Sequence, residues 1–187
     1  MKILGIDPGI TGGFSICDNG VIVEKWVMPM STWKQKKTRK MTEKDKNPDG
    51  RKTKTYIANV KQVDFVQLGI LFDQFDVDKT YIERVHARPE EGVSSSFKFG
   101  MSYGSLLALL SYKKMPYTVV SPSVWTKAVM DGVPANIEGK DRSIIASGRL
   151  FPDVDFIEPR CRKPHMGLVD SSLIAYCGYR KECNEQS

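Results

Sequence analysis

The chain has 187 residues, of which 41% are hydrophobic, so one domain with a substantial core is expected over residues 1–187, and no apolar run reaches the length of a membrane span. Four scattered cysteines without a CxxC pair and only two histidines argue against a zinc site, a disulfide framework or a secreted protein, and we expect a cytoplasmic one. The formal net charge of +6 indicates a polyanionic partner.

The chain begins with three expected strands. Short apolar runs bounded by turn residues predict them at Lys2 to Ile6, Gly13 to Cys17 and Val21 to Val27, and Asp18-Asn19-Gly20 is typical of a tight hairpin turn. The sheet is therefore expected to start antiparallel.

A strongly basic segment follows. From Lys34 to Lys54 ten basic residues stand against three acidic ones, with almost no apolar side chains. Such a segment cannot bury enough surface to fold alone, so we expect a flexible insertion at about 31–57. A solvated linker is the ordinary interpretation, but the bias in sign favours contact with phosphates. The basic side chains expected to touch nucleic acid are Lys36, Lys37, Arg39 and Lys40.

The rest of the chain alternates between helices and strands. Apolar spacing predicts an amphipathic helix over Ala58 to Phe75. Further helices are expected from Ser94 to about Lys113, from Ser121 to Met130, over Gly139 to Leu150 and over Gly167 to Lys181, with strands at Lys79 to Val85 and Tyr117 to Val120 and a loop at Phe151 to Pro164. The predicted fold is α/β, a mixed five-stranded sheet flanked by helices.

Asp7 ends the first apolar run, just before Pro8 and Gly9. Three interpretations compete. The residue can open a type I turn, the following glycines can form a phosphate-binding turn, or the carboxylate can hold a divalent cation at the end of a central strand. Taken alone, the turn interpretation leads.

Two more carboxylates stand in unusual places. Glu83 comes late in a β-prone run, where pairing with Arg84 or Lys79 on a solvent face is about as plausible as a buried role. Asp170 lies near the start of an apolar helix, where an ordinary cap is a common role. If each of the three carboxylates had only its ordinary structural role, their unusual positions in three separate elements would be three separate coincidences.

These residues resemble a known family. The motifs Gly5-Ile-Asp7-Pro-Gly-Ile-Thr-Gly12, Tyr81-Ile-Glu83-Arg-Val-His86 and Ser95-Ser-Phe-Lys-Phe-Gly100-Met-Ser-Tyr-Gly104, followed by Asp170, are similar to the RuvC-type Holliday junction resolvases, phage-encoded members above all. The resemblance runs from residue 1 to about 180, apart from the basic insertion. The first motif alone is weak, because actin-like and sugar kinases share it, but the ordered set is fairly specific.

The resemblance implies a ribonuclease H-like fold and a Mg²⁺-dependent endodeoxyribonuclease. Asp7, Glu83 and Asp170 would hold one or two Mg²⁺ or Mn²⁺ ions, Asp7 bridging them. Two such ions can activate water and stabilise the leaving oxygen in an in-line attack on a phosphodiester. Paired nicks in a Holliday junction or other branched DNA, such as flaps or forks, would leave a 5′ phosphate and a 3′ hydroxyl.

The chain departs from the family at one ligand position. Members carry an acidic or histidine ligand three or four residues before the last aspartate, where this chain has Gly167 and Met166. Neither is an effective ligand for Mg²⁺. His165 can serve as a ligand or as a base that orients water, or be a loop histidine without a role.

The family also implies DNA contacts and a dimer. Lys127 and Lys140 lie where family lysines contact the scissile phosphate, and ordinary exposed lysines are the alternative. Three further basic residues follow Glu83 on a loop expected to flank the site: Arg84, His86 and Arg88. Phe97 or Phe99 can stack on unpaired bases or belong to a core or interface. The small residues of the motif from Gly100 to Gly104, together with the family, suggest a homodimer.

Two other functions remain open from the sequence. A non-catalytic or inactivated protein that binds branched DNA is compatible with the missing fourth ligand. An ATP-dependent kinase of the actin-like fold shares the glycine turn, but would need a second phosphate-binding strand and a larger second half, which the sequence does not offer.

Overall fold

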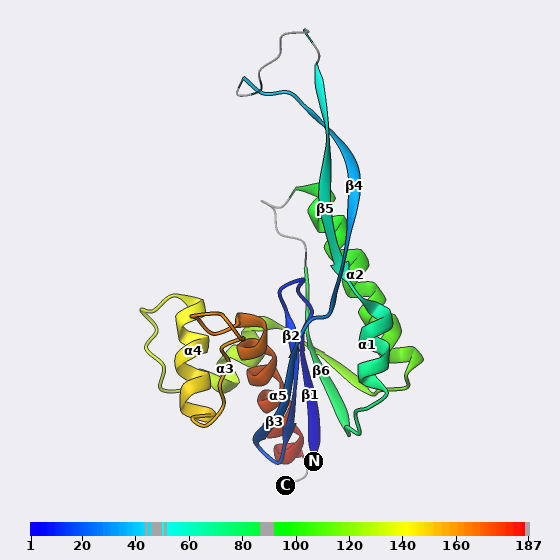
Figure 1. Cartoon of the computed structure of the whole chain (residues 1–187). Coiled ribbons are helices and arrows are strands. Elements are labelled where there is room, and N and C mark those ends of the chain that lie inside the picture. Colours follow the sequence, from blue (N-terminus) through cyan, green and yellow to red (C-terminus); the bar gives the residue numbers. More distant parts are fainter. Residues whose placement is uncertain (44, 46–49, 51, 87–91, 186–187) are drawn as a thin grey trace.

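The computed structural model describes residues 1–187 except 44, 46–49, 51, 87–91 and 186–187. A five-stranded sheet in the order β3-β2-β1-β6-β7 forms its centre (Figure 1). The strands are β1 (Lys2–Asp7), β2 (Gly13–Asp18), β3 (Val21–Val27), β6 (Lys79–Glu83) and β7 (Tyr117–Val120). The first three pair antiparallel, whereas β6 is parallel to β1 and to β7. The predicted mixed sheet with an antiparallel start is confirmed.

Helices cover both faces of this sheet. The helices are α1 (Phe65–Phe72), α2 (Val93–Tyr112), α3 (Pro122–Val129), α4 (Gly139–Leu150) and α5 (Met166–Glu185). One face carries α5, which packs on β1 and β2 and has α3 and α4 beside it, and the other face carries α1 and α2 (Figure 1). Among the described residues, none of these helices combines the length and apolar composition that crossing a bilayer requires.

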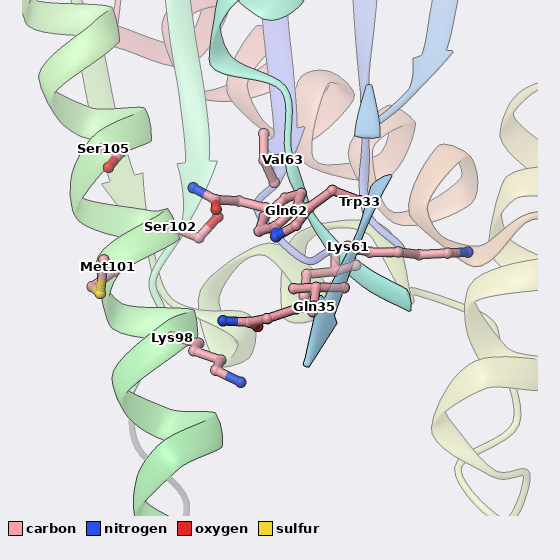
Figure 2. A pocket seen from close by; sticks show the side chains of 11 residues that line it. Trp33, Gln35, Lys61, Gln62, Val63, Lys98, Met101, Ser102 and Ser105 are labelled. Carbon is pink, nitrogen blue, oxygen red and sulfur yellow. The ribbon is translucent and has the colours of Figure 1, made fainter. Parts of the chain in front are cut away.

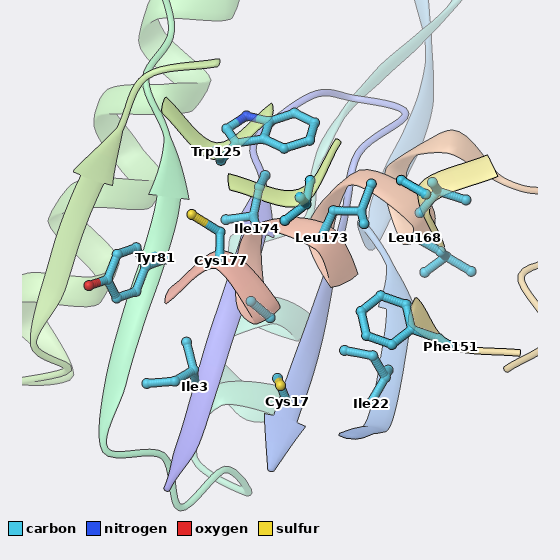
Figure 3. Packing of buried hydrophobic residues seen from close by; sticks show 14 of the residues in the cluster. Ile3, Cys17, Ile22, Tyr81, Trp125, Phe151, Leu168, Leu173, Ile174 and Cys177 are labelled. Carbon is cyan, nitrogen blue, oxygen red and sulfur yellow. The ribbon is translucent and has the colours of Figure 1, made fainter. Parts of the chain in front are cut away.

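Alternating side chains of the strands feed two separate cores. Ile3 and Tyr81 are buried on the α5 face, in a cluster with Leu173 and Ile174 (Figure 3). Leu4, Ile6 and Ile82, which alternate with them along β1 and β6, pack instead under α1 and α2. Because successive residues of a strand face opposite sides of the sheet, odd-numbered residues of β1 and β6 face the core under α5 and even-numbered ones face the core under α1 and α2.

The basic segment departs from the sequence-based expectation of a loop. Residues Met30–Lys40 and Thr53–Val63 form two antiparallel strands, β4 and β5, paired from Met30↔Val63 to Lys40↔Thr53. We call them the β4–β5 ribbon; it projects from the end of the sheet where β3 leaves it (Figure 1). Composition alone predicted no structure here, because each strand finds its hydrogen-bonding partner only in the other.

The expected helix over Ala58 to Phe75 was wrong in its first part. Residues up to Val63 belong to β5, and the helix begins at Phe65. Asp64 caps it, since its carboxylate accepts a hydrogen bond from the Gln67 backbone N–H at 3.0 Å. An N-cap residue marks the start of a helix, so Asp64 locates this start better than the helical spacing of the apolar residues before it.

Candidate active site

Asp7 and Glu83 lie side by side at the carboxyl ends of two adjacent parallel strands. Ile6 and Ile82 are register partners in the β1–β6 pair, and each carboxylate is the next residue on its strand. Asp7 lies four residues after Ile3 and Glu83 lies two residues after Tyr81, and both Ile3 and Tyr81 pack under α5. Alternation therefore directs both carboxylates to the α5 face of the sheet.

Helix α5 brings Asp170 over the same strand ends because glycines let backbones touch. A Cβ at Gly5 would stand 2.2 Å from the Ser171 carbonyl oxygen, and one at Gly167 would stand 2.3 Å from the Gly12 carbonyl carbon. No side chain fits at either contact. The first turn of α5 is thereby pressed against β1 and the turn that follows it.

Three buried hydroxyls fix how α5 sits on β2. The Ser15 and Ser171 oxygens are 2.8 Å apart, and the Ser172 hydroxyl donates to Ser15 Oγ at 2.9 Å. All three side chains are fully buried. Because Ser171 and Ser172 follow Asp170 directly, this network sets the rotation of the helix and with it the direction of the carboxylate. Nothing in the spacing of serines pointed to it.

Electrostatics show that the three carboxylates act on one another. Burial and, after it, the negative charges of Asp170 and Glu83 together raise the pKa of Asp7 from 3.8 to about 7. The Gly9 backbone N–H, which donates to Asp7 Oδ1 at 3.3 Å, partly opposes the shift. In the metal-free site Asp7 is therefore only about half ionised near pH 7.

Asp170 is perturbed in the same direction. Its pKa is raised to about 6, because burial and the Glu83 charge outweigh the opposing effects of the Ser143 hydroxyl and the Lys140 ammonium. Its Oδ1 atom is buried without a hydrogen-bond partner among the described residues. A buried carboxylate oxygen left unpaired is costly unless a cation or donor meets it.

Glu83 is held by a residue that sequence reasoning did not assign. The indole Nε1–H of Trp125 donates to Glu83 Oε1 at 2.9 Å. Trp125 is 4% exposed and belongs to the core under α5. A buried tryptophan needs a partner for its N–H, so the position of Trp125 on the helix after β7 was the available signal. The bond fixes one carboxylate oxygen of Glu83 in place.

The donor set suits a hard divalent cation. Asp7, Glu83 and Asp170 offer carboxylate oxygens, the ligands that Mg²⁺ prefers, and a cation would offset the burial and the charge repulsion that raise the pKa values of Asp7 and Asp170. Within the described part of the chain, no three His, Cys, Asp or Glu side chains form a ready-made metal site. The three carboxylates would therefore have to draw closer around an ion.

The missing fourth ligand has a steric explanation. Gly167 contacts Gly12 backbone to backbone, so position 167 has no room for any ligand side chain. Met166 packs against the core under α5. His165 directly precedes α5, its carbonyl accepts a hydrogen bond from the Leu168 N–H at 3.0 Å, and its Nδ1 is buried without a partner in the described chain. A catalytic part for His165 stays a proposal.

A basic groove runs beside the carboxylates. It is lined in part by Lys140, Lys163, His165 and Thr11. Thr11 belongs to the glycine turn after Asp7, and the charge of Lys140 reaches Asp170. Lys163 was not singled out from the sequence, because a single lysine in an irregular loop carries no pattern.

The other expected DNA contacts are spread over the molecule. Lys127 lines a separate groove with Arg180, ten residues along α5 from Asp170, which is about 15 Å of helix. Arg84 and His86 are exposed just after Glu83, whereas Arg88 lies outside the described residues. The four ribbon residues Lys36, Lys37, Arg39 and Lys40 lie on β4; Arg39 pairs with Asp45, with two contacts of 2.7 Å.

The sheet order and the helices on its two faces define a ribonuclease H-like fold. No protein-family model and no curated protein matches the chain. Solved structures do. Thermus thermophilus RuvC in complex with Holliday junction substrate aligns with a TM-score of 0.62 at 15% identity, covering 98% of this chain and 96% of that one. A second structure of Thermus thermophilus RuvC aligns with a TM-score of 0.52 at 15% identity, over 98% and 97%. The chain therefore has a RuvC-like fold.

Proposed function

We propose that this protein is a metal-dependent endonuclease that cuts branched DNA, Holliday junctions above all. The observation that carries the proposal is the meeting of Asp7, Glu83 and Asp170 on one face of the sheet, where two of them have raised pKa values. A cluster of half-buried, mutually repelling carboxylates costs stability and is typical of a functional site. A basic groove beside it suits a phosphodiester backbone.

In this proposal each residue has a defined part. Asp7, Glu83 and Asp170 would hold one or two Mg²⁺ or Mn²⁺ ions, which when bound supply an activated water and charge stabilisation at the scissile phosphate. Trp125 keeps Glu83 in place. Lys140 holds a neighbouring phosphate, and His165 orients water or supports the metal site. The products would carry a 5′ phosphate and a 3′ hydroxyl.

The DNA would be held beyond the site as well. Exposed ribbon lysines are suited to the backbone of a duplex arm, since a two-stranded ribbon fits the width of a major groove. Arg84, His86 and Lys127 would extend the contact. Helix α2 exposes Phe97, 67% accessible and outside the lining of the cavity beside the ribbon, and a homodimer through the face that carries Phe97 would present two sites to opposed strands of a four-way junction.

The test compares labelled four-way junction, flap and linear duplex, each in Mg²⁺ and in EDTA, with the Asp7→Asn variant as control. Cleavage of the branched substrates only, lost in EDTA and in the variant, is expected. Binding without cleavage in Mg²⁺ would reject the enzyme. Equal binding of junction and linear duplex would reject a branched-DNA function altogether.

A non-catalytic junction-binding protein is the second candidate, favoured by the absence of a ligand at positions 166 and 167. The Met166→Asp variant discriminates the two. A gain in cleavage would indicate a crippled site, and unchanged turnover would indicate a complete one. No observation on the described residues favours the actin-like kinase.

A further inference from the structure

A cavity of about 220 Å³ lies between the base of the β4–β5 ribbon and helix α2. Figure 2 shows Trp33, Gln35 and Gln62 of the ribbon facing Lys98, Met101 and Ser102 of the helix across it. It is smaller than the roughly 300 to 1,000 Å³ of pockets that hold drug-sized ligands. Its size suits a single ring system.

The walls of the cavity suit a flat aromatic group. Trp33 is 42% exposed and Met101 55% exposed, large values for such side chains in a folded domain. Val60, the register partner of Trp33, supplies another apolar surface. An accessible indole beside aliphatic side chains is the arrangement on which nucleobases stack.

The polar groups around the cavity suit a nucleotide more than an apolar peptide or a lipid. The Gln35 and Gln62 amides and the Ser102 hydroxyl can each donate and accept hydrogen bonds, as the edge of a base requires. Lys98 adds a positive charge at the same opening (Figure 2). No carboxylate lies among the described lining residues.

The cavity is also close to the carboxylates. Ile10 lines it, and Ile10 is three residues after Asp7 in the glycine turn. Three Cα steps span at most about 11 Å. The next residue, Thr11, lines the basic groove, so the glycine turn contributes to both the cavity and the groove. A strand whose phosphates follow that groove past Asp7 can therefore bring a nearby base to the cavity.

We propose that this cavity binds one unpaired nucleobase of a branched DNA, stacked on Trp33. The inference rests on the proposed function for its substrate, and it adds a site made by the ribbon. It gives the protein a means of distinguishing a branch point from continuous duplex, because a base that is unpaired or poorly stacked at a branch leaves the stack at a lower cost than one inside a duplex.

The experiment measures binding in EDTA, where no cleavage interferes. The probes are a duplex with a short bulge of unpaired thymidines and the same duplex with abasic residues in the bulge. The wild-type protein is expected to bind the thymidine bulge about 10-fold more tightly, the scale of one base stacked on an aromatic ring. Trp33→Ala should abolish this preference and Trp33→Phe should retain most of it.

Tyr56→Ala is the matched control. Tyr56 is an aromatic residue of the same ribbon, 40% exposed, and lies outside the cavity, so this variant should retain the preference.

Three results would overturn the inference. The first is equal affinity of the wild-type protein for the two bulges, a result that does not depend on any variant folding. The second is an equal loss in Trp33→Ala and Tyr56→Ala, which would indicate a general effect on the ribbon. The third is a dimer that dissociates in Trp33→Ala without any base preference in the wild type, which would mean that a second copy covers the cavity. Cleavage of junctions in Mg²⁺ is scored separately, so failure of the nuclease proposal is distinguishable from failure of this one.

Discussion

Replacing Asp7 with Asn should stabilise the metal-free protein at alkaline pH. The pKa of Asp7 stands at about 7 instead of 3.8. At 1.36 kcal/mol per tenfold change in proton affinity, the charged carboxylate is destabilised in the folded state by up to about 4 kcal/mol. The Asn amide carries no charge and can still accept a hydrogen bond from the Gly9 N–H.

The sign of the pH dependence follows from proton binding. Between pH 3.8 and about 7 the folded protein keeps a proton on Asp7 that the unfolded chain releases. The favourable contribution of this protonation is complete below pH 3.8 and is lost as the pH rises to about 7. Asp170 titrates in the same direction in both proteins, and the difference between them reports Asp7 together with its charge repulsion against Asp170 and Glu83.

The assay is urea and thermal unfolding in EDTA at several pH values. At pH 8 the Asp7→Asn variant should exceed the wild type by up to about 4 kcal/mol, or roughly 10 °C in Tm for a chain of this size. Near pH 4 the two should coincide. Added Mg²⁺ should stabilise the wild type more than the variant. Parallel stability curves from pH 4 to 8 would refute the assignment of Asp7 to a buried, repelling cluster.

Three further predictions follow from single contacts. Trp125→Phe removes the donor to Glu83 and should lower Mg²⁺-dependent cleavage about 10-fold, the lower end for a residue that supports a metal ligand, with junction binding in EDTA unchanged; equal cleavage would show that Glu83 needs no support. Gly167→Ala, which forces a Cβ into backbone, should cost about 3 kcal/mol or more in unfolding free energy, whereas Gly148→Ala, with open space around it, should gain up to about 1 kcal/mol. If the two behave alike in urea, the close approach of α5 is wrong. Neutralising three ribbon lysines to Gln should reduce the slope of log affinity against log salt by about 2 to 3, and an unchanged slope would make the ribbon a passive element; the lysines are Lys36, Lys37 and Lys40.

The sequence predicted the sheet because its strands carry local signals. Apolar runs ended by turn residues located β1, β2 and β3, and the carboxylates at the ends of β1 and β6 were visible as charges in β-prone runs. The β4–β5 ribbon could not be predicted in this way. Its two strands are polar and exposed, and the pairing that stabilises them joins residues on either side of a long connection.

The carboxylates of the candidate site could be named from the sequence, whereas the contacts that support them could not. Asp7, Glu83 and Asp170 were identified by a family resemblance that the fold bears out. The bond from Trp125 to Glu83 and the contact that closes position 167 depend on tertiary packing, which no local pattern records. For the same reason Lys127 was grouped with Lys140, although the two line different grooves.

The backbone contact between Gly5 and α5 has a consequence for the order in which the protein becomes functional. Ser171 is made roughly 165 residues after Gly5, so this contact is among the most non-local in the chain and is expected to form late in folding. During synthesis β1 emerges long before the helix that covers it and completes the carboxylate cluster. A growing chain still attached to the ribosome therefore lacks the complete carboxylate cluster, and the proposed nuclease activity would begin only when the molecule has closed on itself.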